Sequence, residues 1–446
     1  MTIDWKTYNV KDVADFLNGY PFKSKELSQD TSGVPVIKMG NLAVGGGVNL
    51  SIFKSYFTGP LTDKIKKSFA KKYDLLMCMT DMKASMNLLG YSGQVMESDL
   101  YLVNQRVGIL RPKNNDILDN RFFYYVMNSA PVVDYLQQHA NSGVQVNLTA
   151  DSIKNTPIVL PPLATQKQIA AILGKIDEKI NTNTAINNNL EQQAQALLAR
   201  YNTDVQTRCK LGDLLRFVNG FAFKSSEYLA NGIYKVITIK NVQDGKVDSQ
   251  SASCIDELPA KMPTECTLKI GDVLLSLTGN VGRVGIVCEE NLLLNQRVAK
   301  VCAKNPAYNA FLYFVMRQSQ LKTEMENISR GTAQQNLSPV EALNLEINFN
   351  EEMTNKLSGV LKSYFDEIIR NTVESSHLAA IRDALLPKLM SGEIDVSKVD
   401  ISDPSYLDKL LFSEVFKKNA NGRFFIAYIS KYIICTFDKN LGIIIY

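Results

Sequence analysis

The chain contains the same sequence pattern twice, and this internal repeat constrains its fold more than any other feature. The segment Tyr8–Glu26 reappears 201 positions later as Cys209–Glu227, with Asp, Phe, Asn-Gly, Phe-Lys-Ser and Glu at matching places. Further matches follow in the same order: Ile37 and Asn41 with Ile237 and Asn241, Asp74 and Thr80 with Asp272 and Thr278, Asn104–Val107 with Asn295–Val298, and Asn147 and Leu148 with Asn336 and Leu337. A repeat of this length predicts a duplicated domain rather than short stacked units. The chain therefore offers two similar surfaces to a partner that itself has two parts.

The length and composition of the chain fit a protein of two or more domains. At 446 residues the chain is longer than one hydrophobic core usually supports. The net charge of +4 permits nucleic-acid binding without requiring it, because a local basic patch can be hidden in the total. Seven cysteines without paired spacing indicate free thiols in a reducing compartment, and the first residues lack an apolar signal core. We therefore expect a cytoplasmic location and no membrane partner.

The body of each repeat reads as a mixture of short strands and helices. Apolar runs rich in β-branched and aromatic residues predict strands, and they lie at Val34–Leu42, Tyr73–Thr80, Leu100–Leu110, Val236–Val242, Asp272–Leu277 and Leu292–Val301. Helices are expected at Arg121–Ser129, continuing through Val132–Gln138, and at Ala310–Ser319. The predicted fold class is α+β, with a first body at 1–162, a first long helix at 163–204, a second body at 205–349, a second long helix at 350–392 and a C-terminal extension of unknown fold at 393–446.

Each body is followed by a long helical segment with the same pattern of apolar residues. The first helix is expected to open with a capping box at Thr165–Gln168, and the second with Asn350 as its cap. Pro387 is expected to end the straight part of the second helix near Leu386, with Gly392 as the final stop. Residues at four-three spacing form one seam on each helix: Ile169, Leu173, Ile176, Ile180, Asn183, Asn187, Leu190 and Leu197 on the first, and Leu357, Leu361, Tyr364, Ile368, Asn371, Ser375, Leu378 and Leu385 on the second.

Two interpretations of these helices are open from the sequence. Each helix could pack alone on its own body, as amphipathic helices commonly do. Alternatively, the two helices pair as an antiparallel coiled coil, with the polar middle of one seam against the polar middle of the other. Each run extends over some 35 residues, or roughly 50 Å at 1.5 Å per residue, which is longer than a small body needs. We therefore expect the antiparallel pair.

The residues that usually carry catalysis or bind metals are sparse in this chain. The two histidines, His139 and His377, lie near or on expected helices and have no partner at catalytic or zinc-ligand spacing. The glycines of the segment Gly279–Gly285 resemble a dinucleotide-binding loop, but the following residues continue as a strand rather than opening a helix. A hairpin is the better interpretation of that segment, and we expect no catalytic residue, no metal site and no cofactor in this chain.

The remaining polar residues are of the kinds that contact DNA. Arginine reads guanine, asparagine and glutamine read adenine, and lysine, serine and threonine hold phosphates. The candidate contacts in the first copy are Lys23, Lys38, Asn41, Lys83, Asn104, Gln105 and Arg106, and those in the second are Lys224, Lys240, Asn241, Asn280, Arg283, Asn295, Gln296 and Arg297.

An equally open interpretation makes the residues shared by both copies part of the framework. Residues that are identical in the two copies cannot distinguish two different half-sites. Base-reading residues are then expected where the copies differ, namely Lys38–Val48 against Lys240–Val247 and Asp81–Gly93 against Gly279–Arg283.

Three motifs together resemble one family of DNA-recognition proteins. They are Leu160–Ala170 (LPPLATQKQIA), Gly331–Leu337 (GTAQQNL) and Ala384–Ile394 (ALLPKLMSGEI). With the two bodies and two long helices, they resemble the specificity subunit of a type I restriction-modification system over about residues 5–400. The chain departs from the family's pattern after about Val399, where it continues to Tyr446 as a terminal strand pair or as a segment without a selected fold.

The resemblance implies how the chain acts and with what. Each body would be a target recognition domain that reads one half of a bipartite double-stranded DNA sequence. The two helices would form a spacer that docks two methylation subunits, and restriction subunits would join the complex. S-adenosylmethionine, ATP and magnesium would belong to those partner subunits. A stand-alone methyltransferase or nuclease, and a scaffold that binds proteins with its two bodies, are the alternatives.

Overall fold

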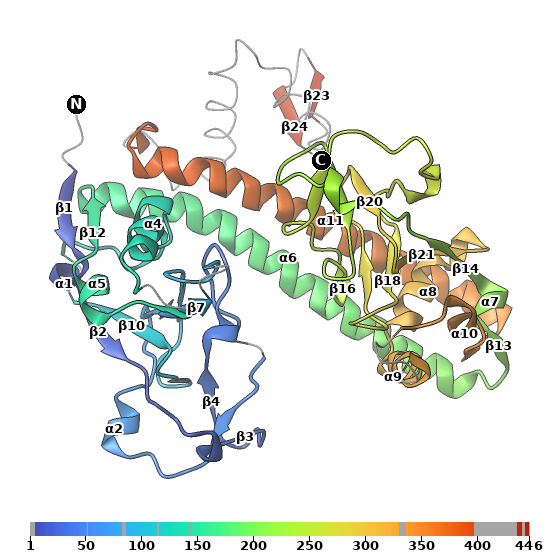
Figure 1. Ribbon diagram of the computed structural model, residues 1–446, viewed down its shortest axis with the longest axis horizontal. Coiled ribbons are helices and arrows are strands. Elements are labelled where there is room, and N and C mark those ends of the chain that lie inside the picture. The colour runs from blue at the N-terminus through green and yellow to red at the C-terminus, as the bar shows by residue number, and fades with distance from the viewer. Residues whose placement is uncertain are drawn as a thin grey trace. The chain divides into compact units, whose positions relative to one another are not determined.

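Each copy of the repeat folds into a mixed body of short strands and helices, which confirms the expected α+β class (Figure 1). The computed structural model describes residues 5–50, 52–82, 86–113, 116–141, 145–329, 336–396, 435–438 and 442–445. The chain divides into unit 1, which comprises Met1–Ile176 and Ile381–Tyr446, and unit 2, which comprises Asp177–Ala380. Within the described residues, no helix is both long and apolar enough to cross a membrane.

The body of unit 1 is built from twelve strands and five short helices of the described chain. They are β1 (Lys6–Asn9), α1 (Val10–Val13), β2 (Ala14–Asn18), β3 (Leu27–Ser28), β4 (Val34–Ile37), β5 (Tyr56–Phe57), α2 (Asp63–Lys66), β6 (Leu75–Cys78), β7 (Thr80–Met82), β8 (Ser92–Gln94), β9 (Leu102–Val103), β10 (Val107–Pro112), α3 (Asn120–Met127), α4 (Ala130–Gln138), β11 (Gln145–Asn147), α5 (Ala150–Lys154) and β12 (Pro157–Leu160). One sheet has the order β2-β10-β6-β8 and is antiparallel, and a second has the order β3-β5-β4-β9 with β4 and β9 parallel.

The body of unit 2 repeats this plan with small changes. Its elements are β13 (Arg208–Lys210), α7 (Leu211–Leu214), β14 (Leu215–Asn219), β15 (Tyr234–Ile237), β16 (Gly245–Lys246), β17 (Ser253–Ile255), β18 (Val273–Ser276), β19 (Val284–Ile286), β20 (Leu292–Leu294), β21 (Val298–Ala303), α8 (Asn309–Met316), α9 (Ser319–Ile328), α10 (Pro339–Leu343) and β22 (Glu346–Asn348). The sheet β14-β21-β18-β19-β16 matches the first sheet of unit 1 and gains one edge strand, and β17-β15-β20 again contains a parallel pair.

Several expected strands are shorter than predicted because a turn interrupts them. Leu100–Leu110 is two strands, since the amides of Asn104 and Gln105 donate to the carbonyls of Ile37 and Tyr20, both at 3.0 Å, instead of continuing one ladder. The same interruption divides Leu292–Val301. The expected strands at Val34–Leu42 and Val236–Val242 end at Ile37 and Ile237, each five residues early. The apolar runs therefore predict the presence of a strand correctly. Where the strand ends depends on hydrogen bonds to backbone groups that are distant in the sequence.

The helical expectations for the bodies need one correction. Ala310–Ser319 is α8 followed by a separate α9, which extends to Ile328. Arg121–Ser129 and Val132–Gln138 correspond to α3 and α4, and these are also separate helices. The break in unit 1 follows from Ser129 and the proline near the start of α4, because proline cannot donate the backbone hydrogen bond that a continuous helix requires.

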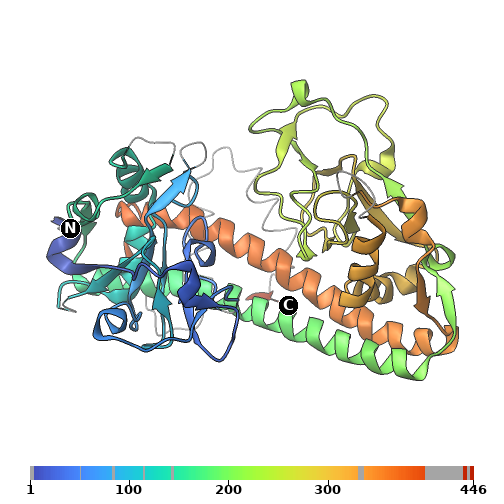
Figure 2. The same cartoon turned by 60° about the horizontal axis from the view of Figure 1, so that its bottom comes forward.

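The two long helices are α6 (Leu163–Asp204) and α11 (Glu351–Met390), and they pair antiparallel in unit 2 (Figure 2). The hydroxyls of Tyr201 and Thr354 are 2.6 Å apart, while Asn183, in the middle of α6, donates to Glu374, which lies later in α11, at 2.7 Å. Late residues of α6 therefore contact early residues of α11. The middle of the seam is polar, as expected: Asn371 Nδ2 donates to Asn187 Oδ1 at 2.9 Å.

The helix pair is also packed against the body of unit 2. One apolar cluster contains Leu198 of α6, Leu361 and Phe365 of α11, and Phe311 and Phe314 of α8. Burial of each such side chain contributes roughly 1.5–3 kcal/mol to stability. Both interpretations of the helices thus hold in part, because each helix contacts its partner helix and a body at once.

The ends of the helices differ from expectation at two places. α6 begins at Leu163, so Thr165 lies inside the first turn and the predicted capping box is wrong; Gln166 instead donates to the carbonyls of Ile117 and Pro161 at 2.9 and 2.8 Å. α11 continues past Leu386 to Met390 with Pro387 inside it. A proline so near the end removes one backbone donor and disturbs only the last turn.

The stop and the cap of α11 agree with the sequence. Gly392 has a φ of +72°, the left-handed conformation that commonly ends helices. At the other end, Asn350 Oδ1 accepts from the amide of Met353 at 3.0 Å. In the C-terminal extension, β23 (Cys435–Asp438) and β24 (Gly442–Ile445) form an antiparallel pair.

Candidate nucleic-acid interface

The Asn-Gln-Arg motif of each copy forms a turn that packs on the Asn-Gly corner near the start of the body. In unit 1 the amide of Gln105 donates to the carbonyl of Tyr20 at 3.0 Å, and in unit 2 Gln296 donates to Phe221 at 2.9 Å. The turn lies between β9 and β10 in unit 1 and between β20 and β21 in unit 2. The two sequence motifs therefore recur because each is one side of the same contact.

This contact leaves no room for a side chain at the corner glycine. A Cβ on Gly19 would lie 2.2 Å from the carbonyl oxygen of Asn104, and one on Gly220 would lie 2.0 Å from that of Asn295. No heavy atoms approach so closely without a bond, so glycine is required at both corners. The glycine of the repeated Asn-Gly is thus explained by close backbone approach.

The asparagines shared by the two copies have their side chains committed to the fold. Asn241 is buried, accepts from the amide of Thr238 at 2.9 Å and donates to the carbonyl of Asp248 at 2.8 Å. Asn41 makes the equivalent bonds to Lys38 and Asn49, at 3.0 and 3.1 Å. These amides close the loop that follows β4 or β15, so we assign them to the framework.

Two further shared positions form a matched pair. Thr80 Oγ1 donates to Asn147 Oδ1 at 2.8 Å, and Thr278 Oγ1 donates to Asn336 Oδ1 at 2.8 Å. Asn295 is also buried and donates to the hydroxyl of Tyr228 at 3.0 Å. Identity between the copies therefore marks hydrogen bonds inside each body at these sites.

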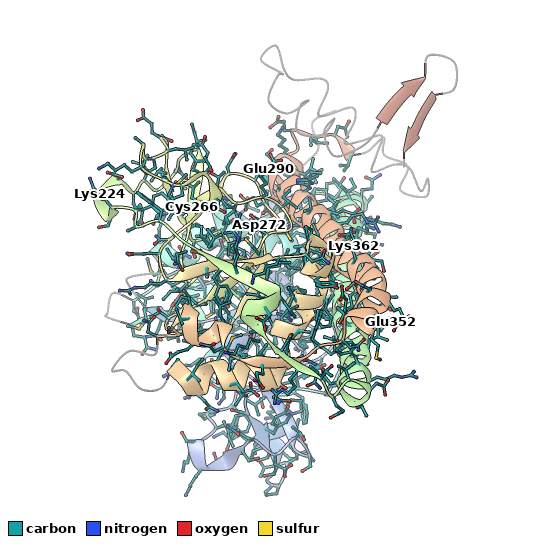
Figure 3. The ribbon with its side chains drawn as sticks, turned by 90° about the vertical axis from the view of Figure 1, so that its right-hand side faces the viewer. Lys224, Cys266, Asp272, Glu290, Glu352 and Lys362 are labelled. Atoms are coloured by element: carbon teal, nitrogen blue, oxygen red, sulfur yellow. The ribbon has the colours of Figure 1, made fainter. Side chains whose placement is uncertain are left out.

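Other predicted contacts are exposed. The exposed ones are Lys23, Gln105, Arg106, Lys224, Lys240, Asn280, Gln296 and Arg297. Figure 3 shows Lys224 at the periphery of unit 2, and its ammonium lies 3.8 Å from Glu227 with the lysine side chain 79% exposed. Such a weakly held cation can exchange its partner for a phosphate at little cost.

Three candidates are not simply exposed. Lys38 is half-buried and its Nζ donates to Ser55 Oγ at 2.6 Å, while the side chain of Asn104 accepts from the amide of Arg106 at 3.4 Å. Arg283 Nη1 donates to Gln243 Oε1 at 2.7 Å. Lys83 lies outside the described residues.

The two segments that differ between the copies lie side by side in each unit. In unit 1 the amide of Gly47 donates to the carbonyl of Ser92 at 3.0 Å, which joins the segment Lys38–Val48 to the end of Asp81–Gly93. In unit 2 the bond between Arg283 and Gln243 joins Gly279–Arg283 to Lys240–Val247. Sequence reasoning missed Gln243, because its role depends on a residue 40 positions away.

The shapes of these neighbouring loops differ between the units. In unit 1, Gly45, Gly46 and Gly47 all have positive φ, and Val44 at the tip is 62% exposed. The loop is closed by the pair Leu42 and Val48 in unit 1 and by Val242 and Val247 in unit 2, where it is one residue shorter and only Gly245, with a φ of +90°, has a positive φ. Each unit thus places a different pair of loops on a common framework, which suits recognition of two different sequences.

The described residues carry little chemistry of other kinds. They contain no group of three or more His, Cys, Asp or Glu side chains that could hold a metal ion. Burial raises the pKa of the Cys78 thiol to about 11 and that of Cys288 to about 12, so these thiols stay protonated. His139 stacks on Tyr135 and bonds to its carbonyl at 2.8 Å. The segment Gly279–Gly285 leads into β19, which pairs with β18 as a hairpin.

The seam residues of the two helices are buried or half-buried. Buried ones are Ile169, Leu173, Ile176, Asn183, Leu361, Ile368, Asn371 and Leu385, and half-buried ones are Ile180, Asn187, Leu190, Leu197, Leu357, Tyr364, Ser375 and Leu378. Glu374 was not predicted, although it accepts from Asn183 and lies 3.3 Å from the ammonium of Lys179. Glu374 lies beside the seam and not in it, so the four-three spacing of seam residues does not mark it.

Comparison with known proteins agrees with this geometry. The family described as Type I restriction modification DNA specificity domain matches residues 2–192 and 203–349. The MjaVIII specificity subunit of a type I restriction enzyme from Methanocaldococcus jannaschii is 22% identical over 437 residues, covering 89% of this chain and 94% of that protein. The EcoBI specificity subunit from Escherichia coli is 22% identical over 436 residues, covering 87% and 86%.

A solved structure shares the fold. The S subunit of a type I restriction-modification system from M. genitalium superimposes with a TM-score of 0.53 at 16% sequence identity. The match covers 87% of this chain and 96% of that one. At this identity the likeness concerns the fold alone.

Proposed function

Because the chain belongs to the type I restriction-modification DNA specificity family, it is a non-catalytic specificity subunit with two recognition domains, and we propose that each domain reads one half of a bipartite double-stranded DNA target. We assign the first domain to residues 1–162 and the second to 205–349. The long helices, within 163–204 and 350–392, would carry the geometry between the half-sites and no sequence information.

The observation that carries this proposal is that the two bodies share a framework but differ in a pair of neighbouring loops. The shared asparagines and glycines are occupied inside each body, whereas the neighbouring loops differ in length, glycine content and side chains. Base contacts carry sequence information and phosphate contacts fix position. We therefore place base reading in Lys38–Val48 with Asp81–Gly93, and in Lys240–Val247 with Gly279–Arg283.

The exposed residues of the Asn-Gln-Arg turns are proposed as backbone contacts. Arg106 and Arg297, with Gln105 and Gln296, occupy the same place in both copies. Identical residues suit a feature that both half-sites share, and the phosphate backbone is that feature.

The family's members assemble into complexes, and we propose the composition of this one. Two methylation subunits would dock on the helices, and restriction subunits would join them. S-adenosylmethionine, ATP and magnesium would be bound by those partners. We also propose that the protein is cytoplasmic, which the free thiols at the six cysteines from Cys78 to Cys302 support.

Exchange of one body tests the assignment of half-sites. Replacing Met1–Pro161 with the corresponding body of a relative, in a cell that carries the partner subunits, should change one half of the methylated sequence and leave the other intact. Sequencing of methylated sites measures both halves at once. A change in both halves, or in neither, contradicts the assignment.

A second measurement tests the proposed division of labour. The purified chain alone should neither bind S-adenosylmethionine nor methylate DNA, and methyl transfer should appear only after a methylation subunit is added. Methyl transfer by the chain alone would contradict the proposal.

A further inference from the structure

The first body carries a basic region that its counterpart in the second body lacks. Residues 20–72 contain nine lysines, no arginine and three acidic residues, a net charge of +6. The corresponding residues 221–270 contain six lysines and six acidic residues, a net charge of zero. The total charge of +4 for the whole chain conceals this difference.

Most of the excess lies in one short segment. Lys64, Lys66, Lys67, Lys71 and Lys72 fall within nine residues, and all five are exposed. Among the described residues their one salt bridge joins Lys66 to Asp63 at 3.6 Å, with those side chains 58% and 97% exposed. A bridge so exposed contributes little and does not neutralise the segment.

The fold holds this segment in a defined place on unit 1. Ile65 and Phe69 pack in one apolar cluster with Phe22 and Phe57. The backbone amide of Lys72 donates to Ser98 Oγ at 2.9 Å. In Figure 1, α2 lies at the outer edge of unit 1. The charges therefore project from an anchored backbone and not from a loose tail.

Two further lysines follow Phe22, a buried member of the same cluster. Lys23 and Lys25 are exposed on either side of Ser24, one and three positions from this buried ring. The difference in net charge between the two bodies is not cancelled by acidic residues further along the chain. Unit 1 has Glu97 and Asp99, and unit 2 has Glu289 and Glu290 at the corresponding place.

The choice of lysine indicates what the segment contacts. Base reading in the major groove favours the fixed fork of arginine, whereas lysine acts as a point charge that suits single phosphates. A region with nine lysines and no arginine is suited to the DNA backbone. Contacts of this kind also supply the attraction of a protein to DNA of any sequence.

We propose that Lys64–Lys72 contacts backbone phosphates and makes the first body the main electrostatic anchor of this chain on DNA, an inference that rests on the proposed function. The second body contributes little to non-specific attraction and acts mainly through its loops. Each lysine that neutralises a phosphate steepens the dependence of log affinity on log salt by about 0.9.

The test measures duplex binding against salt concentration for the full chain assembled with its methylation subunits. The variant Lys64→Gln, Lys66→Gln, Lys67→Gln is compared with the control Lys261→Gln, Lys269→Gln, Lys304→Gln, whose lysines are also exposed and lie outside the proposed base-reading segments. The first triple should flatten the slope by about two to three and weaken binding at least tenfold at low salt. The control should leave the slope nearly unchanged. Arginine at positions 64, 66 and 67 should restore it.

Equal flattening by both triples, or by neither, overturns the proposal, as does failure of the arginine variant to restore the slope in a folded complex. Loss of the methylation subunit with an unchanged slope also overturns it, because the lysines would then contact protein. A different result would show that the proposed function itself is wrong. The unmodified complex would bind target and scrambled duplexes of equal length equally, and the comparison of slopes would still decide the role of the lysines.

Discussion

Asn183 and Asn371 lie against each other in the middle of the helix pair: the side-chain amide of Asn183 donates to the backbone carbonyl of Asn371 at 3.4 Å. The two residues are counterparts in the two sequence copies, 188 positions apart. Around them, Asn183 donates to Ser375 and Asn371 donates to Asn187, which are the same contact made from each side. The two copies thus meet about a local twofold axis at this point.

The contact between Asn183 and Glu374 is predicted to stabilise the helix pair. The bond is 2.7 Å long and its acceptor is charged, but Glu374 is 42% exposed, so we expect a coupling of roughly 0.5–1.5 kcal/mol. A double-mutant cycle with Asn183→Ala and Glu374→Ala, followed by denaturant unfolding, measures it. The matched control is the pair Glu352 and Lys356, which is exposed on one helix and should couple more weakly. Equal couplings in the two cycles would refute a special role for the centre.

Replacement of the corner glycine should be costly. Gly220→Ala places a Cβ 2.0 Å from the carbonyl oxygen of Asn295, so the backbone must move and stability should fall by roughly 2–3 kcal/mol or more. The control is Gly359→Ala, where no atom lies within 4 Å of the new Cβ and the residue is in α11. That change should raise stability by about 0.5–1 kcal/mol. Scanning calorimetry of both variants decides the matter, and a tolerated Gly220→Ala would contradict the close approach.

Shortening both helices together should bring the half-sites closer. Deletion of Asn181–Asn187 with Ile369–Ser375 removes one heptad from each helix, or roughly 10 Å, which corresponds to about three base pairs of duplex. This change also rotates one half-site by roughly 100°, so activity should fall and the surviving activity should favour the shorter spacer. Sequencing of methylated sites reads spacer and half-sequences together.

Two results bear on the ruler interpretation. Deletion of Asn181–Asn187 alone should abolish activity, because it shifts the register of one helix against the other. Full activity of the double deletion at the original spacing would mean that the helices do not set the distance.

The half-buried thiol of Cys288 should lose its proton only at high pH. Its pKa is raised to about 12 by burial, whereas an ordinary thiol has a pKa near 8.5. Alkylation of the folded chain by iodoacetamide, quantified on the Cys288 peptide by mass spectrometry, should therefore keep accelerating from about pH 9 to pH 11. In the unfolded chain the rate should level off near pH 9. A plateau near pH 9 in the folded chain would show that burial does not hold the proton.

The repeated sequence alone determined the existence of two like bodies, the α+β class and the antiparallel partner of each long helix. These features rest on local periodicity and on matched residues, which one chain displays directly: the four-three spacing marks a buried stripe, and Asn183 with Asn371 marks its polar centre. The cap at Asn350 and the stop at Gly392 are likewise local.

Tertiary structure alone decided which repeated residues are framework and which loops meet. Asn241 and Gln105 look alike as polar contacts in the sequence, yet Asn241 is buried under its own loop and Gln105 is exposed. The bond from Arg283 to Gln243 joins segments 40 positions apart, and the strands around Asn104 end because a distant carbonyl takes the amide. These outcomes depend on which distant groups form hydrogen bonds with each buried donor or acceptor. Those partners come together only when the chain has folded.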